Sequence, residues 1–370
     1  MLIGAPKEVK VAEQRVGLTP TAVHELVAHG HQVVVGNNAG IGIGADDAAY
    51  REAGARIASA EEVWDQAEMI VKVKEPQAAE RAMLSSDQVL FTYLHLAPDA
   101  PQTTDLIASG ATCIAYETVT DNRGGLPLLA PMSRVAGRMS VQAGAHALEA
   151  PNGGSGILLG GVPGVPPAST VVIGGGVVGE NAIEMAIGLG SRVTVIDRSV
   201  DALDRLDRRF GPGLQTVYST KHAIEKAVAA ADLVIGAVLV KGDKAPKLVT
   251  AEMVKTMKQG SVMVDVAIDQ GGCFETSHAT THSEPTFVVD GVVHYCVANM
   301  PGAVPLTSTY ALNNATLPFV LALADKGARQ ALLDDANLLG GLNVHAGRIT
   351  EAHVAASQGL DYIEPVAALG

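Results

Sequence analysis

The sequence predicts an α/β protein with two doubly wound parallel-sheet domains. Three observations support this prediction: strand-like runs alternate with helical patterns over residues 1–130, a glycine-rich strand–turn–helix unit begins near residue 171, and an apolar helical stretch follows residue 305. Strands that alternate with helices are typical of βαβ units, in which the strands are parallel. A chain of 370 residues also exceeds the usual size of one hydrophobic core.

The alternation itself defines the first domain. Its strand-like runs are HQVVVG, MIVKVKE, QVLFTYLHL and ATCIAYE, with helical patterns such as TAVHELVAHG and AEEVWDQA between them. Pro131 and Ser133 then begin a helix that we expect to end near Ala150. After Pro301 and Pro305 the stretch STYALNNATLPFVLALADKG is too apolar to lie alone in water. We therefore expect it to return to the first domain.

The dinucleotide-binding unit is the most informative segment. In VVIGGGVVG, Gly174 permits a tight turn, Gly176 lets the backbone approach a pyrophosphate, and Gly179 lets the following helix pack closely on the strand. The strand SRVTVID ends at Asp197, about 20 residues later, where a carboxylate can accept from both ribose hydroxyls and would repel a 2′-phosphate. The sequence thus predicts NAD as the cofactor.

Further strands at LQTVYS, ADLVIGAVL, GSVMVDVAI and HYCVANM complete this second sheet. We expect residues 130–305 to form a Rossmann-type NAD-binding domain. This domain would be inserted into a discontinuous substrate domain of residues 1–129 and 306–370.

Composition excludes several classes of protein. A net charge of −13 without blocks of Lys or Arg argues against a nucleic acid or an anionic membrane as partner. Cys113, Cys273 and Cys296 are too few and too far apart for a disulfide framework. His278 and His282 have the spacing of a metal pair but no evident third ligand, so we expect no metal. With no secretion signal and no uninterrupted apolar run of about 20 residues, we expect a soluble cytoplasmic protein.

Four polar side chains lie at or near predicted strand ends, where ligands bind in open α/β sheets. Arg15 could hold a carboxylate through two parallel hydrogen bonds, or be a surface arginine. Lys74 could present its ammonium to an anion, or be solvated. His95 could exchange a proton near neutral pH, or be a hydrogen-bonded core histidine. Asp269, on the same side as Asp265 in one strand, could bind ammonium or water, or cap a loop.

Longer matches resemble one known family over essentially the whole chain. They are GAPKEVKVAEQRVGLTP, VKVKEP, LFTYLHLAPD, VVIGGGVVGENAIEMAIGLGSRVTVID, VDVAIDQGGC and VANMPGAVPLTST, and they are similar to the alanine dehydrogenases. The same superfamily contains the NAD-binding subunit of proton-translocating transhydrogenase. The resemblance implies NAD-dependent interconversion of L-alanine with pyruvate and ammonium in a homohexamer.

The resemblance also assigns residues to roles. It places Arg15 and Lys74 at the substrate carboxylate and carbonyl, makes His95 and Asp269 the catalytic pair, and lines the substrate with Tyr93, Met132 and Asn299. His278 departs from the arginine that some relatives carry near the cofactor phosphates. The implied cofactor-binding residues are Ser133, Gly174, Gly176, Val177, Val178, Gly179, Asp197, Ser219, Val238, Leu239, Ala267, Ile268, Asp269, Val297, Asn299 and Met300.

Two other functions compete with this hypothesis. One is the soluble NAD-binding component of a transhydrogenase, which passes hydride between nucleotides. The other is a non-catalytic protein that senses NAD through domain closure. The simultaneous presence of Arg15, Lys74, His95 and Asp269 favours an amino-acid substrate.

Overall fold

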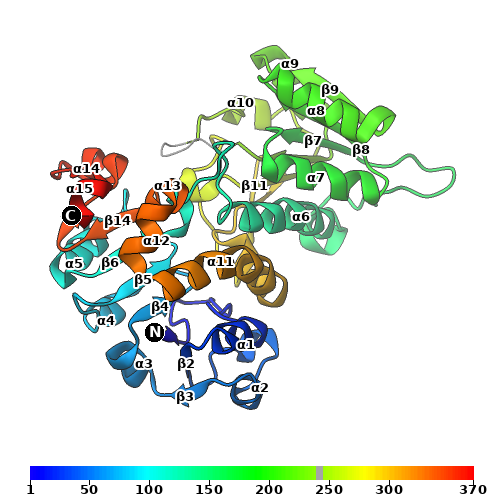
Figure 1. Cartoon of the computed structure of the whole chain (residues 1–370). Helices are drawn as coiled ribbons and strands as arrows, with labels where there is room; N and C mark the ends of the chain where they lie inside the picture. Colours follow the sequence, from blue (N-terminus) through cyan, green and yellow to red (C-terminus); the bar gives the residue numbers. More distant parts are fainter. Residues whose placement is uncertain (239–244) are drawn as a thin grey trace. The chain divides into compact units, whose positions relative to one another are not determined.

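The computed structural model describes residues 1–238 and 245–370. The chain divides into two compact units, and the N-terminal and C-terminal segments share one of them (Figure 1). Unit 1 comprises Met1–Met132 and Val304–Gly370, and unit 2 comprises Ser133–Ala303. Among the described residues, no helix combines the length and apolarity that a membrane span requires.

Unit 1 is built on an eight-stranded sheet in the order β15-β14-β6-β5-β4-β1-β2-β3. Strands β1 to β6 are all parallel, and the chain reverses its direction of winding between β1 and β4. The C-terminal segment adds β14, antiparallel to β6, and the short β15. The strands are β1 (Leu2–Ala5), β2 (Gln32–Gly36), β3 (Arg56–Ala58), β4 (Met69–Val71), β5 (Val89–Thr92), β6 (Thr112–Ala115), β14 (Leu342–His345) and β15 (Arg348–Ile349).

Several helices of unit 1 begin at polar caps, and the helices bury apolar side chains. Thr19, Asp46 and Ser59 each accept a hydrogen bond from a backbone N–H of the helix that follows. Trp64 and Leu106 are fully buried in the core beneath them. These helices are α1 (Pro20–Ala28), α2 (Asp47–Glu52), α3 (Ala60–Gln66), α4 (Ala78–Arg81), α5 (Ala100–Ser109), α11 (Pro305–Lys326), α12 (Ala328–Asp334), α13 (Ala336–Leu339), α14 (Ala352–Gln358) and α15 (Pro365–Leu369).

Unit 2 is built on a seven-stranded sheet in the order β12-β13-β11-β10-β7-β8-β9. All pairs are parallel except β12 with β13, and the order reverses between β7 and β10. Its strands are β7 (Ser169–Ile173), β8 (Arg192–Asp197), β9 (Leu214–Tyr218), β10 (Leu233–Gly236), β11 (Val262–Asp265), β12 (Thr286–Val289) and β13 (Val292–Tyr295). The helices are α6 (Ala130–Ala147), α7 (Val177–Gly188), α8 (Val200–Phe210), α9 (Lys221–Ala230) and α10 (Ala251–Val254).

The prediction of a doubly wound α/β fold is confirmed, but the edges of both sheets were not foreseen. Both sheets share the strand order 3-2-1-4-5-6 in their parallel part, which places ligand sites beside the reversal point. The antiparallel strands β12, β14 and β15 at the edges span only two to four residues each.

Several predicted strands end earlier in the structure. Strand β4 ends at Val71, β5 at Thr92 and β11 at Asp265, so Lys74, His95 and Asp269 lie on the loops that follow. The prediction that Asp265 and Asp269 share one side of a strand is therefore wrong. The Asp265 carboxylate accepts hydrogen bonds from the backbone N–H groups of Cys273 and Phe274, and the chain turns around it.

The glycine-rich turn of unit 2 has the backbone that the motif requires. Gly174 has a φ of 104°, which side chains disfavour, and Gly176 begins α7 as its N-cap. A Cβ on Gly179 would lie 1.8 Å from the carbonyl oxygen of Gly174. Because glycine has no Cβ, α7 packs closer to the turn after β7 than any other residue at position 179 would permit.

Unit 1 buries a cluster of three charges beneath the end of β4. The Lys72 ammonium donates to Glu8 Oε2 at 3.0 Å and to Glu80 Oε1 at 2.8 Å, and all three side chains are almost fully buried. Burial would lower the pKa of Lys72, but the two carboxylates outweigh it and raise this pKa. The cluster therefore holds a charged lysine inside the unit.

Replacement of Gly179 by alanine tests the close packing of α7. We expect Gly179→Ala to lower the free energy of unfolding by about 1–3 kcal/mol, because the methyl group collides with backbone. Gly188→Ala on the same helix is the matched control, since its Cβ meets no atom within 4 Å. Urea denaturation followed by circular dichroism measures both. Equal stability of the two variants would contradict the packing described.

Removal of the buried lysine tests the charge cluster. We expect Lys72→Met to cost about 3–5 kcal/mol at pH 8, because two buried carboxylates lose their shared cation. The cost should shrink on acidification, because burial raises the pKa of Glu8 and a protonated Glu8 needs no cation. Lys255→Met, which removes an exposed partner of Glu252, should change the urea midpoint little. A Lys72→Met variant as stable as the wild type would be inconsistent with this account.

Candidate active site

Arg15 lies in the loop between β1 and α1, at the carboxyl end of the unit 1 sheet. Its side chain is only 2% exposed, so the alternative of a surface arginine is wrong. Nε donates to Glu13 Oε1 at 2.7 Å and Nη2 donates to Oε2 at 2.5 Å, while Nη1 contacts Met132 Sδ at 3.0 Å. This two-point pairing fixes the plane of the guanidinium.

A pocket of about 290 Å³ opens beside this pair. It lies within unit 1, next to the point where the strand order reverses. Charged side chains gather on its wall, so it suits a small polar ligand. The lining residues are Lys7, Glu8, Glu13, Gln14, Arg15, Asn38, Ala39, Ile41 and Gly42.

Lys74 follows β4, and Glu8 holds the backbone there. Glu8 Oε1 accepts from the N–H of Val73 at 2.7 Å and lies 3.4 Å from the N–H of Lys74, while Oε2 binds Lys72. Burial raises the pKa of Glu8 even though Lys72 opposes it. Lys74 is half-buried.

His95 lies beyond the end of β5 in a conformation that side chains rarely adopt, with a φ of 53°. Its side chain is 49% exposed, which excludes the alternative of a core histidine. Nδ1 lies 3.4 Å from Glu117 Oε1. Partial loss of contact with water would lower the pKa of His95, but the Glu117 carboxylate outweighs this effect, so this pKa lies above its ordinary value.

Glu117 was not predicted from the sequence. This residue follows β6 within a short 3-10 helix, Tyr116–Thr118, and its carboxylate accepts from the N–H of His95 at 2.6 Å. A signal was present, because an acid two residues after the strand TCIA lies at the same carboxyl end of the sheet as His95. Burial would raise the pKa of Glu117, but His95 and the backbone donors lower it.

Tyr93 and Met132 support the other groups. Tyr93 is buried, and its hydroxyl donates to the carbonyl oxygen of Leu128 at 2.6 Å. Its ring meets the rings of Tyr116 and His95 edge-on, at 5.1 and 5.7 Å between centroids. The structure thus brings Arg15 together with Met132, and Tyr93 together with His95, within unit 1.

In unit 2, the Asp197 carboxylate lies directly against the glycine-rich turn. Oδ2 accepts from the N–H of Gly175 at 2.6 Å and Oδ1 accepts from the N–H of Ser199 at 2.7 Å. Ser219 lies next to Asp197 and donates its N–H to the carbonyl oxygen of Asp197 at 2.9 Å. Each carboxylate oxygen keeps a second lone pair that a ribose hydroxyl could use.

Arg205 on α8 is a second residue that the sequence analysis did not single out. Its Nη2 donates to the carbonyl of Gly175 at 2.9 Å, and Arg205 also pairs with Glu180 on α7. Burial would raise the pKa of Glu180, but Arg205 and Arg209 lower it. The amphipathic pattern of DALDRLDRRF was the available signal.

The loop after β11 carries Asp269 on a short 3-10 helix, Ile268–Gln270, where its side chain is exposed. Asp265 holds this loop from inside by accepting from Ala267, Cys273 and Phe274, and from the Ser277 hydroxyl at 2.7 Å. Lys247 donates to the carbonyls of residues 271 and 274. The loop is therefore fixed around Asp265 even though Asp269 reaches solvent.

Asn299 has a φ of 63°, and its carbonyl oxygen lies 3.1 Å from Nε2 of His282. His278 instead stacks on Phe287, with ring centroids 3.7 Å apart. In the part of the chain that the structure describes, no group of three His, Cys, Asp or Glu side chains could hold a metal ion.

The remaining predicted cofactor residues differ in exposure. Gly176 and Val177 are exposed, while Ser133, Val178 and Val238 are half-buried. Leu239 lies outside the described residues. The buried ones are Ala267, Ile268, Val297 and Met300.

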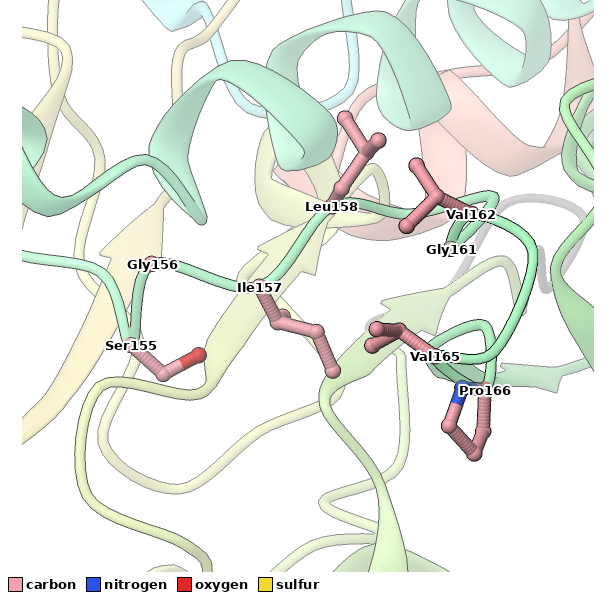
Figure 2. A pocket seen from close by; sticks show the side chains of 8 residues that line it. All are labelled: Ser155, Gly156, Ile157, Leu158, Gly161, Val162, Val165 and Pro166. Atoms are coloured by element: carbon pink, nitrogen blue, oxygen red, sulfur yellow. The ribbon is translucent and has the colours of Figure 1, made fainter.

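A second hollow, of about 370 Å³, lies in the loop between α6 and β7. Figure 2 shows apolar side chains around it, and Leu158 and Val165 are more than half exposed. Its lining carries no charged group, so it lacks the chemistry of the first pocket. The lining residues are Ser155, Gly156, Ile157, Leu158, Gly161, Val162, Val165 and Pro166.

Known proteins resemble this chain over its full length. Family models described as the N-terminal and C-terminal domains of alanine dehydrogenase/PNT match residues 4–136 and 140–352. An alanine dehydrogenase of Halomonas elongata is 62% identical, and the alignment covers all of both chains. A solved L-alanine dehydrogenase matches 97% of this chain and 99% of its own, with a TM-score of 0.94 and 53% identity. A transhydrogenase from Sinorhizobium meliloti matches 94% of this chain and all of its own, with a TM-score of 0.84 and 25% identity. The chain therefore belongs to the alanine dehydrogenase/PNT family.

Proposed function

We propose that this chain catalyses the reversible NAD-dependent oxidative deamination of L-alanine to pyruvate and ammonium. The observation that carries this proposal is the buried Arg15 guanidinium, fixed by Glu13 beside a polar pocket. A fixed guanidinium suits the carboxylate that alanine and pyruvate share. Full-length relatives that bear the name alanine dehydrogenase support the same substrates.

The residues of unit 2 fit NAD. Gly176 is exposed at the N-terminus of α7, and a Cβ there would meet no atom within 4 Å, so the backbone is open to a pyrophosphate. Asp197 offers free lone pairs to ribose hydroxyls and a negative charge that disfavours a 2′-phosphate. When bound, NAD supplies the acceptor for the hydride that leaves Cα of alanine. The other cofactor-binding residues predicted from the sequence would line its path.

The residues of unit 1 would bind and orient the substrate. Arg15 and Lys74 would hold the carboxylate and carbonyl region, with Tyr93 and Met132 beside them. Orientation of this kind supplies much of the rate in hydride transfer, because the reacting atoms must lie about 3 to 3.5 Å apart.

Proton transfer falls to His95 and Asp269. After hydride loss, water attacks the iminium carbon, and His95 would take the proton of the resulting hydroxyl as the carbinolamine collapses to pyruvate. Asp269 would stabilise the cationic nitrogen and orient the water. In the opposite direction His95 would protonate the oxygen of pyruvate.

The competing functions receive less support. The transhydrogenase match is less similar than the alanine dehydrogenase matches, and hydride exchange between two nucleotides would not need Arg15 and His95. A pure NAD sensor would not need a histidine held beside a carboxylate.

We also propose that the chain forms a cytoplasmic homohexamer without nucleic acid or membrane partners. Light scattering would measure the number of subunits.

An assay of the purified chain tests the reaction directly. With L-alanine and NAD we expect NADH, pyruvate and ammonium in equal amounts. His95→Ala and Asp269→Ala should lower kcat by about 100-fold or more with unchanged melting temperature, because each removes a proton-handling group. His24→Ala, at an exposed site on α1, is the control and should keep full activity. Near-wild-type turnover of His95→Ala would refute the mechanism, and nucleotide-to-nucleotide exchange without alanine oxidation would favour a transhydrogenase component.

The role of Arg15 is tested by the conservative change to lysine. We expect Arg15→Lys to lower kcat/KM for alanine by roughly ten- to a hundredfold, because an ammonium cannot bind Glu13 and a substrate carboxylate in the same planar arrangement. Steady-state kinetics with alanine varied at saturating NAD gives this value. An unchanged kcat/KM would show that Arg15 does not contact the substrate.

A further inference from the structure

The Glu117 carboxylate makes two contacts with His95, one with its backbone and one with its ring. Its Oε1 accepts from the N–H of His95 at 2.6 Å and lies 3.4 Å from the ring nitrogen Nδ1. Both carboxylate oxygens also lie 3.2 Å from the N–H of Leu94. A single carboxylate thus binds the backbone and the imidazole of the same residue.

The backbone contact accounts for the unusual conformation of His95. With a φ of 53°, this residue occupies the left-handed region that β-carbons disfavour. Such a conformation persists only where neighbouring groups hold it. The charged acceptor on Glu117 does so, because hydrogen bonds to ionised groups are stronger than neutral ones.

The ring contact determines which nitrogen of the imidazole can react. Because Nδ1 faces a carboxylate, the favoured neutral tautomer carries its proton on Nδ1. Nε2 is then the nitrogen without a proton, and the ring is 49% exposed, which leaves it accessible. The buried Tyr93 ring packs beside the imidazole in an edge-on arrangement, with ring centroids 5.7 Å apart.

Glu117 itself is held firmly. It follows Tyr116, whose ring packs edge-on against Phe91 at 4.4 Å and against Tyr93 at 5.1 Å. The Glu117 side chain is only 16% exposed. Its position relative to His95 is therefore set by the core of unit 1 and not by a mobile surface loop.

The charges that act on His95 come from two segments of the described chain. Glu117 lies after β6, and Lys74 and Glu75 lie after β4. Lys74 opposes protonation of the imidazole, while Glu75 and more strongly Glu117 favour it. Glu75 also pairs with Lys10, which reduces its share. Glu117 is the dominant charged partner.

We infer that Glu117 is a positioning residue that holds His95 by its backbone and by Nδ1, so that Nε2 exchanges the proton with the substrate. This inference rests on the proposed function. When water adds to the iminium carbon, the proton that this water loses passes to the nitrogen, so the carbinolamine carries an –NH3⁺ group. As this carbinolamine collapses, its O–H proton passes to Nε2, the O–H electron pair forms the C=O bond of pyruvate, and ammonia leaves with the electrons of the C–N bond. The imidazolium that results faces the Glu117 carboxylate, which stabilises it.

The test compares Glu117→Gln with the wild type by two measurements. Glutamine keeps an acceptor for the backbone N–H groups but removes the charge. NMR titration of histidine-labelled protein, with His95→Gln to assign the signal, should show the pKa of His95 lowered by about one pH unit in Glu117→Gln. The acidic limb of the pH profile of kcat/KM for alanine should move to lower pH by the same amount, and kcat should fall about tenfold or more with little change in KM.

Two further variants keep the result interpretable. Asp325→Asn removes a carboxylate that pairs with His29 and His31 on the surface of unit 1, so it is the matched control and should leave the pH profile of kcat/KM unchanged. Glu117→Asp keeps the charge on a shorter side chain and should give a His95 pKa between those of wild type and Glu117→Gln. If Glu117→Gln folds poorly, Glu117→Asp alone should still show a His95 pKa below that of the wild type.

Two outcomes would overturn the inference. The first is an unchanged His95 titration in Glu117→Gln. The second is a fall in kcat with an unmoved pH profile, which would mark Glu117 as merely structural. A wild-type chain that fails to oxidise alanine would overturn the proposed function separately, because the NMR titration reports the pairing without any turnover.

Discussion

A carboxylate placed after one strand, accepting hydrogen bonds from the backbone beyond the neighbouring strand, is the interaction on which both units depend. Glu8 follows β1 and binds the N–H of Val73 beyond β4, and Glu117 follows β6 and binds the N–H of His95 beyond β5. In unit 2, Asp197 ends β8 and binds the N–H of Gly175 beyond β7. These strand pairs are neighbours in their sheets, so each carboxylate joins two adjacent loops.

This arrangement explains how polar loops keep a fixed geometry at the carboxyl end of an apolar sheet. Backbone N–H groups in loops beyond the strands have no partner in the sheet, and an ionised acceptor satisfies them more strongly than a neutral one. Carboxylates also act on the two cations to which we assign functional roles. Glu117 raises the pKa of His95, and Glu13 holds the guanidinium of Arg15. In this chain Glu117 thus both joins two loops and acts on the proposed proton carrier.

The sequence predicted the elements whose signals are local, and it failed where partners are distant in the chain. Glycine spacing and β-branched runs were sufficient to predict the turn at Gly174 and the strand that ends at Asp197, because each depends on adjacent residues. The ends of β4 and β11 were placed too late, since Glu8 and the loop around Asp265 end those strands through side-chain contacts that periodicity does not encode. Glu117 was missed for the same reason: its role depends on β5 and β6 being neighbours.

The most direct test of this account is a crystal structure of the chain with NAD and pyruvate. We predict that the pyruvate carboxylate contacts Arg15, that the keto oxygen lies within hydrogen-bond distance of Nε2 of His95, and that Nδ1 remains on Glu117. The Asp197 carboxylate should accept from the adenosine ribose while still holding the N–H of Gly175. A structure in which pyruvate binds away from Arg15, or in which the His95 ring turns Nδ1 toward the ligand, would contradict the account.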